Sequence, residues 1–513
     1  MNLCTYLNER ALRNPEYLAF MEDDVKLTFQ QLEAQSQHIA QGLRELGVGP
    51  GSRVALLLPN GLIYAQATFG IWRLGAQVVL VNPQLTGPEL KYILEDSAAQ
   101  VAIIQGSILE QVQSQREHLP CLTTVISIEP VQGADHLWAN LLNTPICAQI
   151  PIAPVTTQDI AAVLYTSGTT GRPKGALLSH GNLEANSRSG IQVMQVTEQD
   201  RFFCILPMFH AFAFTCALVI PVRSGASAVL AAKFAPRQLA LQLTDPALTL
   251  VLAVPSLLGT LLKFPAPFRL GSGVRAVLCG GAALSPDLEA AFRSRFGVTV
   301  LQGYGATECS PLAAYNPPDG VQKPGSIGLP MPEGHELAIA EPDGEELLGT
   351  GQIGELVVRG PHVFLGYLNQ PEATAKTFTA TGWLRTGDLA YRDQDGYYFV
   401  VDRIKDMINV AGEKVFSPEV EAILQAYPGI QESAVVGAPD PGKGEIVWAY
   451  VTLTERQPSA QAKAQLIDQL IQHCRTQLAT FKVPKHIEIL EDFPRSGVGK
   501  ILKRVLRQQL VTG

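Results

Sequence analysis

Short apolar runs alternate with amphipathic helical stretches along most of the N-terminal part of this chain. Thr28 begins a helical stretch that ends at Leu46, and Ser285 with Pro286 gives an N-cap and a first-turn proline to a helix over 287–296. The apolar runs lie at 53–58, 76–81, 160–165, 226–231, 249–254 and 274–279. Continuous apolar strands separated by helices are typical of parallel sheets that helices cover. The pattern therefore predicts buried, layered α/β structure.

The pattern changes after about residue 325. Alternating runs at 355–358 and 397–401, with Asp343-Gly344 and Asp395-Gly396 turns, indicate a small antiparallel unit. From Ser417, which we expect to cap a helix with Pro418 in its first turn, the pattern is again mixed. It predicts strands at 433–436, 447–453 and 486–490 and a long helix at 460–478.

We therefore predict an α/β protein with a large N-terminal domain and a small C-terminal α+β domain. The N-terminal domain, 1–402, would contain two βα-layered subdomains, about 1–160 and 161–325, and a small antiparallel β unit at 326–402. The C-terminal domain would span 403–513. A length of 513 residues agrees with two or more domains.

Charge and cysteine usage exclude several classes of protein. The chain has 39 Lys plus Arg against 47 Asp plus Glu, and a net charge of -8 argues against a nucleic-acid partner. Its eight cysteines include no CxxC pair and do not have the spacing of zinc ligands, so we expect them to be buried thiols in a reducing compartment. The N-terminus resembles no signal or transit peptide, which predicts a cytoplasmic protein.

The longest apolar stretch, 205–222, is interrupted by Pro207, His210 and Pro221, so we expect a buried helix and no transmembrane segment. A mean hydropathy of +0.13 is high for a soluble protein. It is compatible with an apolar binding cavity and with peripheral membrane contact.

The most informative segment is the Gly- and hydroxyl-rich run 165–175, YTSGTTGRPKG. It follows an apolar strand and precedes a helical stretch from Asn182. Glycines let backbone N–H groups approach phosphate oxygens, and Ser and Thr add short donors. The Walker A spacing cannot be aligned on it, and the alternative is an ordinary flexible turn. We predict contacts to a phosphate-bearing ligand from Thr166, Ser167, Gly168, Thr169, Thr170, Gly171 and Lys174.

Five further motifs follow in order along the chain. They are PMFH at 207–210, QGYGATE at 302–308, TGD at 386–388, DRIKD at 402–406 and PRSGVGK at 494–500. With them the chain resembles the adenylate-forming superfamily of acyl-CoA synthetases, peptide-synthetase adenylation domains and luciferases. The resemblance extends from about Leu27 to Lys503.

This resemblance implies that MgATP and a carboxylic acid give acyl-AMP, which a thiol then attacks. In-line attack on an α-phosphate needs Mg²⁺ and cations to offset charge, and Glu308 is the expected Mg²⁺ ligand. Asp388 would hold the ribose hydroxyls with Arg403, and Lys500 would stabilise the transition state. The predicted catalytic and nucleotide residues also include Thr307, Tyr304, Gly280, Gly281, Ala282, Ala283, Gly303 and Gly305.

The two half-reactions share one site in this family, so Lys500 must withdraw before the thiol arrives. The resemblance places a hinge at Lys405 and a thiol channel at Ala411 and Gly412. The sequence departs from the usual pattern at Asp402, where a glycine is common, and at Ala411-Gly412, where two glycines are common. The acceptor would be CoA or the phosphopantetheine arm of an acyl carrier protein.

The acid pocket should be apolar. No carboxylate follows His210, as pairing with an α-ammonium would require, so amino acids are disfavoured. We expect a medium or longer fatty acid, with an aryl acid as the alternative. His210 is interpreted as a pocket wall and gate or, with equal weight, as a packed histidine. The predicted lining comprises His210, Ala211, Ala213, Phe214, Val254, Gly280 and Gly305.

Other functions have less support. A catalytically idle binding protein would not need the intact set of Glu308, Asp388 and Lys500, and no dedicated motif indicates a luciferase-like oxygenase. The chain is therefore expected to be a ligase that uses a small-molecule acid, ATP and CoA.

Overall fold

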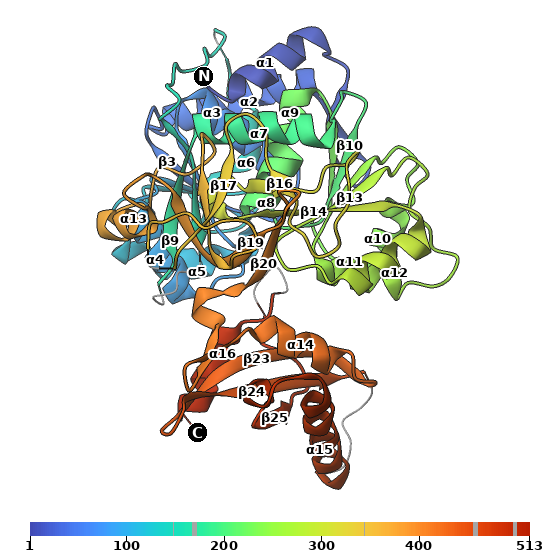
Figure 1. Ribbon diagram of the computed structural model, residues 1–513. Helices are drawn as coiled ribbons and strands as arrows, with labels where there is room; N and C mark the ends of the chain where they lie inside the picture. Colours follow the sequence, from blue (N-terminus) through green and yellow to red (C-terminus); the bar gives the residue numbers. More distant parts are fainter. Residues whose placement is uncertain (147, 167–171, 343, 455–459, 496–499, 513) are drawn as a thin grey trace. The chain divides into compact units, whose positions relative to one another are not determined.

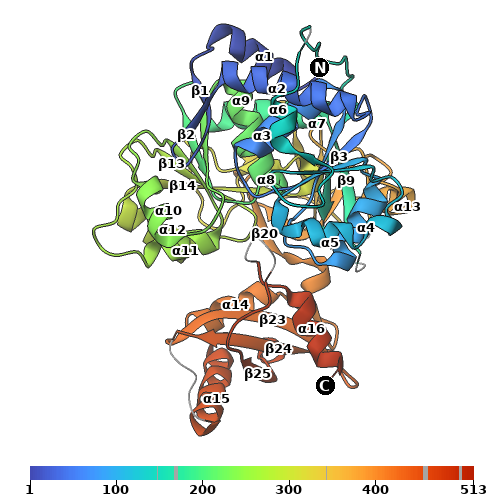
Figure 2. The ribbon, with the colours of Figure 1, turned by 180° about the vertical axis from the view of Figure 1, so that it is seen from behind.

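The structure is a computed structural model that describes residues 1–146, 148–166, 172–342, 344–454, 460–495 and 500–512. The chain forms two compact units, each composed of two segments. Unit 1 is Met1–Leu337 with Val357–Arg385, and unit 2 is Ala338–Leu356 with Thr386–Gly513. Figures 1 and 2 show the elements of each unit from opposite sides.

The first sheet of unit 1 has seven strands in the order β7-β6-β5-β3-β4-β8-β9. All its pairings are parallel except that of β8 with β9. Helices α4 (Gly87–Ser97) and α5 (Leu109–Gln113) bury apolar side chains against it. The strands are β3 (Arg53–Leu57), β4 (Gln77–Leu80), β5 (Val101–Ile104), β6 (Thr124–Ser127), β7 (His136–Leu137), β8 (Ile160–Thr166) and β9 (Lys174–Ser179).

The second sheet of unit 1 has nine strands in the order β16-β15-β14-β13-β12-β10-β11-β1-β2. Its central strands are parallel, and antiparallel strands lie at both ends. Helices α10 (Pro236–Leu243), α11 (Pro255–Leu262) and α12 (Pro286–Phe296) pack on one face (Figures 1 and 2). The strands are β1 (Leu18–Glu22), β2 (Val25–Thr28), β10 (Arg201–Cys204), β11 (Ser227–Leu230), β12 (Leu250–Ala253), β13 (Ala276–Cys279), β14 (Thr299–Gly305), β15 (Leu312–Tyr315) and β16 (Leu329–Pro330).

The remaining helices of unit 1 pack largely on one another and include the predicted apolar stretch. That stretch becomes α8 (Ala211–Phe214), a π-helical turn (Thr215–Val219) and α9 (Ile220–Ser224). It is a buried helix, as expected, and no helix within the described ranges is long and apolar enough to cross a membrane. The other helices are α1 (Cys4–Arg13), α2 (Phe29–Glu45), α3 (Leu62–Arg73), α6 (Trp138–Leu142), α7 (His180–Met194) and α13 (Pro371–Thr377).

Unit 2 contains most of a four-stranded sheet and all of a five-stranded sheet. The first has the order β17-β18-β19-β20, and the second contains β21 to β25. Side chains of α14 and α15 pack on one face of the second sheet, and α16 packs through a separate cluster. The bounds are β17 (Glu336–Ala340), β18 (Gly354–Arg359), β19 (Leu384–Arg392), β20 (Tyr398–Arg403), β21 (Ile408–Val410), β22 (Glu413–Val415), α14 (Ser417–Gln425), β23 (Ile430–Asp440), β24 (Gly444–Leu453), α15 (Ala460–Gln477), β25 (His486–Ile489) and α16 (Lys503–Thr512).

The predicted fold class, layered α/β structure followed by an antiparallel unit and a small α+β domain, is confirmed. Thr28 and Ser285 cap α2 and α12 as expected, because their hydroxyls accept from Gln31 N at 3.2 Å and Leu288 N at 3.2 Å. The prediction that Ser417 caps α14 is wrong. The helix begins at Ser417, and the Asp402 carboxylate accepts its backbone N–H at 2.7 Å. The predicted domain boundary at 402 stays a prediction.

Candidate active site

The predicted phosphate loop connects two antiparallel strands. Thr166 and Lys174 are paired at the ends of β8 and β9, so the loop closes a hairpin, and helix α7 begins only after β9. The sequence pattern did not anticipate this intervening strand. Ser167, Gly168, Thr169, Thr170 and Gly171 lie outside the described residues.

Helix α4 holds both stems of this hairpin. The Tyr165 hydroxyl donates to Asp96 at 2.7 Å before the loop, and the Tyr92 hydroxyl donates to the Pro173 carbonyl at 3.1 Å after it. Burial, followed by the Asp96 carboxylate, raises the pKa of Tyr165, so this phenol stays a donor. The stems are therefore fixed independently of any ligand.

Lys174 and the expected metal ligand Glu308 both contact Tyr367. The Lys174 ammonium nitrogen lies 4.9 Å from the centroid of the Tyr367 ring, and the Tyr367 hydroxyl donates to Glu308 Oε1 at 2.7 Å. A cation over an aromatic face is attracted by the ring quadrupole. Three chain segments distant in sequence thus meet in unit 1. Tyr367 could not be predicted from the sequence, because a lone tyrosine in a loop carries no pattern.

Glu308 belongs to a 3₁₀ turn, Thr307–Cys309, which follows strand β14. Four backbone carbonyls around this turn accept hydrogen bonds from neighbouring elements. Asn186 Nδ2 of α7 donates to Cys309 O at 3.1 Å and Leu312 O at 2.7 Å, and Thr215 Oγ1 donates to Ser310 O at 3.0 Å. Phe364 N donates to Glu308 O at 2.9 Å. These bonds fix the backbone that carries Thr307 and Glu308.

The glycines predicted to contact the nucleotide differ in the space that surrounds them. A Cβ at Gly305 would lie 1.7 Å from Pro311 O, and one at Gly303 would lie 2.6 Å from the Tyr315 ring, so both positions serve backbone packing. Gly281 has φ +80°, and it is exposed together with Ala282 and Ala283. Tyr304 is half-buried. The exposed residues of this group, 281–283 and Gly305, are therefore the part that a ligand could reach.

The residues predicted for the acid pocket form two groups, one buried in the core and one near Gly280 and Gly281. Ala211, Ala213 and Phe214 are buried, and Phe214 packs edge-on against Trp72 with ring centroids 5.8 Å apart. The half-buried Phe212, which the sequence analysis did not select, has its ring 3.7 Å from the position of a Cβ on Gly280. Val254 lies 3.6 Å from the corresponding position on Gly281.

His210 precedes helix α8 and has a neutral side chain near neutral pH, since burial lowers its pKa to about 4. Its ring packs against Phe209 with centroids 4.5 Å apart. Its Nε2 atom is buried and has no hydrogen-bond partner within the part of the chain that the structure describes. A buried polar atom without a partner suits a position that faces a ligand or an ordered water.

In unit 2, the predicted ribose residues form an ion pair. Arg403 Nε donates to Asp388 Oδ1 at 2.8 Å, and the two residues are paired across β19 and β20. Asp388 is buried, whereas the Arg403 side chain is 43% exposed. The Thr386 hydroxyl accepts Asp388 N at 3.1 Å and holds the turn.

Lys500 ends a loop whose base is closed by an antiparallel bridge between Arg495 and Ile501. Arg495 is anchored by a salt bridge to Glu432. Desolvation and then the positive charge of Arg403 lower the pKa of Lys500, while Asp388 opposes that shift. Residues 496–499 of the predicted motif lie outside the described residues.

Within unit 2, the predicted hinge segment is joined to the start of α14 by a buried polar cluster. Asp402 accepts from the Ser417 hydroxyl at 3.0 Å, Lys503 donates to that hydroxyl at 2.7 Å, and Lys503 pairs with Glu421 at 2.6 Å. The Asp402 carboxylate thus accepts the backbone N–H at the start of α14. This role explains why residue 402 is an aspartate where a glycine is common. Lys405 itself is exposed in a 3₁₀ turn, Ile404–Asp406.

Ala411 and Gly412 form the two-residue turn of the β21–β22 hairpin. Their φ values are +54° and +93°, as a type I′ turn requires. Asn409 Oδ1 accepts Gly412 N at 2.9 Å. Ala411 therefore occupies a left-handed conformation in which a glycine would be unstrained.

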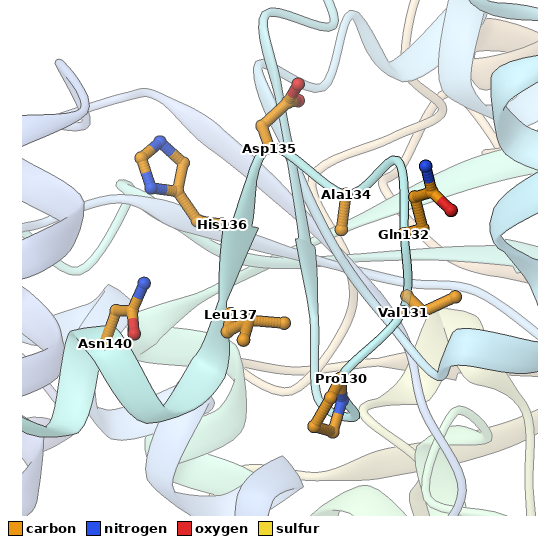
Figure 3. Close-up of a pocket in the computed structure, with 8 residues that line it drawn as sticks. All are labelled: Pro130, Val131, Gln132, Ala134, Asp135, His136, Leu137 and Asn140. Carbon is orange, nitrogen blue, oxygen red and sulfur yellow. The ribbon is translucent and has the colours of Figure 1, made fainter.

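An open pocket of about 520 Å³ lies beside β7, at the edge of the seven-stranded sheet (Figure 3). In this pocket the Asp135 carboxylate forms an ion pair with Arg116, with 2.8 Å between Nη2 and Oδ2, and accepts a hydrogen bond from Val125 N at 2.7 Å. The lining contains no predicted site residue. It comprises Pro130, Val131, Gln132, Ala134, Asp135, His136, Leu137 and Asn140.

Comparison with known proteins agrees with this arrangement. Residues 7–368 match the AMP-binding enzyme family, and residues 419–500 match the C-terminal domain of AMP-binding enzymes. The chain is 36% identical to a feruloyl-CoA synthase of Amycolatopsis sp, over 98% of this chain and 97% of that protein. It is 32% identical to a long-chain-fatty-acid–CoA ligase of Mycobacterium tuberculosis, over 99% of this chain and 98% of that protein.

Among solved structures, the anthranilate CoA ligase AuaEII in complex with anthranoyl-AMP superposes with a TM-score of 0.90 at 29% identity. The match covers 99% of this chain and 97% of that one. Because the family match covers most of the chain and the relatives match along nearly their whole length, the chain belongs to the AMP-binding enzyme family and is an AMP-forming acid–thiol ligase of the acyl-CoA synthetase type.

Proposed function

We propose that this protein activates a medium or long-chain fatty acid with ATP and transfers the acyl group to CoA. The observation that carries the nucleotide part is the Glu308 carboxylate, held at one oxygen by Tyr367 on a turn that α7 and the π-helical turn fix. Activation and CoA thioester formation are the chemistry of the family. The acid, the residue roles and the choice of acceptor are the proposal.

Glu308 fits a magnesium ion as a partner. Its Oε1 atom accepts from Tyr367, and its Oε2 atom has no partner in the described ranges. A carboxylate oxygen is the kind of ligand that Mg²⁺ prefers. When bound with ATP, the ion would neutralise phosphate charge as pyrophosphate leaves. Lys174 would add a second positive charge beside the phosphate loop.

In unit 2, Asp388 would accept hydrogen bonds from the ribose hydroxyls, because a carboxylate offers two acceptor oxygens. Lys500 would stabilise the charge that develops as the carboxylate attacks the α-phosphate. Withdrawal of Lys500 about a hinge at Lys405 would then admit the thiol at the Ala411-Gly412 turn. The predicted boundary at 402, immediately before this hinge, belongs to the same proposal.

An aryl acid is the second candidate substrate. Phe212 presents a flat aromatic ring beside Gly280, and aromatic rings pack favourably in offset or edge-on arrangements. The apolar surroundings from Phe212 and Val254 support a fatty acid equally well, since each buried CH₂ contributes about 0.8 kcal/mol. The lack of a carboxylate after His210 disfavours amino acids in either case.

The test is the release of AMP by purified protein with MgATP, free CoA and a panel of acids of increasing chain length together with hydroxycinnamic and benzoic acids. A rising kcat/KM from short to medium or long chains is the expected result. Preference for the aryl acids would select the second candidate. Turnover with a holo acyl carrier protein but not with CoA would replace the proposed acceptor.

Seven cysteines within the described ranges are free thiols, and six of them are buried. This arrangement suits a reducing compartment, so we propose that the enzyme acts in the cytoplasm, with peripheral membrane contact as one route to an apolar acid.

A further inference from the structure

We infer that Tyr367 is a positioning residue for the magnesium and phosphate machinery, and that it acts by fixing the carboxylate of Glu308 and the ammonium of Lys174 relative to each other. This inference rests on the proposed function. It adds a residue that lies outside every motif identified in the sequence.

The backbone of Tyr367 is tied to the strand that follows the phosphate loop. Residues on both sides of it exchange hydrogen bonds with β9: Leu365 N with Leu177 O at 3.0 Å, and Leu368 N with Gly175 O at 2.8 Å. Tyr367 N itself donates to Thr374 Oγ1 at 2.8 Å. The residue therefore occupies a fixed position relative to the start of β9, where Lys174 lies.

The side chain of Tyr367 is fixed by packing as well. Its ring contacts the ring of Phe364 edge-on, with centroids 4.9 Å apart, and Phe364 N is bonded to the carbonyl of Glu308. Asn182 of α7 donates to the carbonyls of Pro361 and Val363, each at 2.8 Å, and so holds the segment that leads to Phe364. The contact with Phe364 restricts the rotamers of the Tyr367 ring and therefore the direction of its hydroxyl.

That hydroxyl donates to Glu308, since a phenol carries its proton near neutral pH and a carboxylate can only accept. The 2.7 Å bond to Oε1 orients the carboxylate, and Oε2, which has no partner among the described residues, can bind a cation. Hydrogen bonds to charged groups are the strong ones in proteins.

The same ring limits the position of Lys174. Its ammonium lies 4.9 Å from the ring centroid, and the attraction of the aromatic face favours this position for the positive charge. A phenylalanine would preserve the ring and its attraction for Lys174 but would release the carboxylate. Loss of the hydroxyl alone should therefore affect cation binding more than folding.

The experiment compares Tyr367→Phe with Tyr6→Phe, which removes another tyrosine hydroxyl that donates to a glutamate, Glu184, at 3.4 Å in unit 1. Binding of Mn²⁺ is followed by electron paramagnetic resonance in the presence of α,β-methylene-ATP, which cannot be adenylated. We expect Tyr367→Phe to weaken Mn²⁺ binding roughly tenfold, as loss of a charge-assisted hydrogen bond implies, and Tyr6→Phe to leave it unchanged. The Mg²⁺ concentration needed for half-maximal ATP–pyrophosphate exchange should rise by the same factor.

A double-mutant cycle separates positioning from a structural role. In a Glu308→Gln background, Tyr367→Phe should have no further effect on Mn²⁺ binding if it acts through that carboxylate. Unchanged Mn²⁺ binding in the single variant, or an equal loss in both backgrounds, would overturn the inference. Failure of the wild type to adenylate any acid would overturn the proposed function instead, while the Mn²⁺ titration would still decide the role of Tyr367.

Discussion

Each charged residue expected to act on ATP has a neighbour that fixes it. Tyr367 orients Glu308, Arg403 pairs with Asp388, and an antiparallel bridge closes the loop of Lys500. Preorganised charges of this kind contribute most to transition-state stabilisation because they need not reorganise during the reaction. The motifs and the resemblance predicted Glu308, Asp388 with Arg403, and Lys500, whereas Tyr367 comes from another segment and carries no sequence signal.

Lys500→Ala should slow acyl-AMP formation by about 100- to 1,000-fold, the usual effect of removing one group that stabilises developing charge. Transfer to CoA from chemically supplied acyl-AMP should remain close to that of the wild type, because only the first step needs this charge. Rapid-quench measurement of the two half-reactions tests both statements. Lys485→Ala, at an exposed position of the same unit, is the matched control. Equal losses in both half-reactions would remove Lys500 from its proposed role.

The turn at Ala411-Gly412 predicts opposite effects from two neighbouring substitutions. Ala411→Gly should raise the free energy of unfolding by about 0.5–1 kcal/mol because it relieves a left-handed alanine. Gly412→Ala should lower it by about 1–2 kcal/mol, although a Cβ there would contact nothing within 4 Å. Urea unfolding of both variants measures the difference. Changes of the same sign would contradict the backbone explanation.

At the scale of elements, we propose that the helical segment after His210 decides which side chains reach the acid. The sequence suggested the small residues Ala211 and Ala213, but both are buried, whereas Phe212 is half-buried and faces Gly280. A π-helical turn follows within the same segment, and such turns often occur at functional sites. The facing direction depends on helix rotation, which apolar patterning cannot resolve in a segment that is apolar on all sides.

Phe212→Ala should enlarge the space beside Gly280 and raise the relative kcat/KM for bulkier acids about tenfold or more. Ala213→Trp should instead overpack the core, cost roughly 1–3 kcal/mol of stability and reduce activity with every acid alike. The acid panel and the melting temperature of each variant give both readouts. If Ala213→Trp changed the order of kcat/KM among the acids without changing the melting temperature, Ala213 would line the acid pocket after all.

Elements with strong local signals were predictable, and those that depend on distant partners were not. The capped helix at Thr28 and the buried strands follow from periodicity and side-chain capping, which are local properties. Strand β1 pairs with β11, about two hundred residues later, and β8 pairs with β4 of the earlier sheet. The start of α14 could not be predicted for the same reason. The carboxylate that accepts the Ser417 backbone N–H belongs to Asp402, which lies before the helix in another element.

At the scale of the whole molecule, unit 1 carries three buried histidines and the half-buried His210, which should make its stability depend on pH. The rings of His335 and His362 stack with centroids 3.8 Å apart, and both residues are buried. His362 has no hydrogen-bond partner on either ring nitrogen within the described ranges. Burial lowers the pKa of His335 to about 4 and that of His362 to about 2, and it lowers those of His180 and His210 to about 4.

These histidines should stabilise unit 1 at neutral pH and destabilise it in mild acid. The unfolded chain binds more protons below pH 6.5, the ordinary histidine value, so stability falls as the pH decreases from 6.5 toward the folded-state pKa values. Each such histidine should lower the free energy of unfolding by about 1.4 kcal/mol at pH 5.5 relative to neutral pH.

His362→Phe keeps a stacked ring without the titration, so it should lose less stability than the wild type between pH 7.5 and 5.5. Calorimetric unfolding at the two pH values measures this, with the exposed His118→Phe as the control. An identical decrease in the wild type and His362→Phe would show that another group governs the acid response.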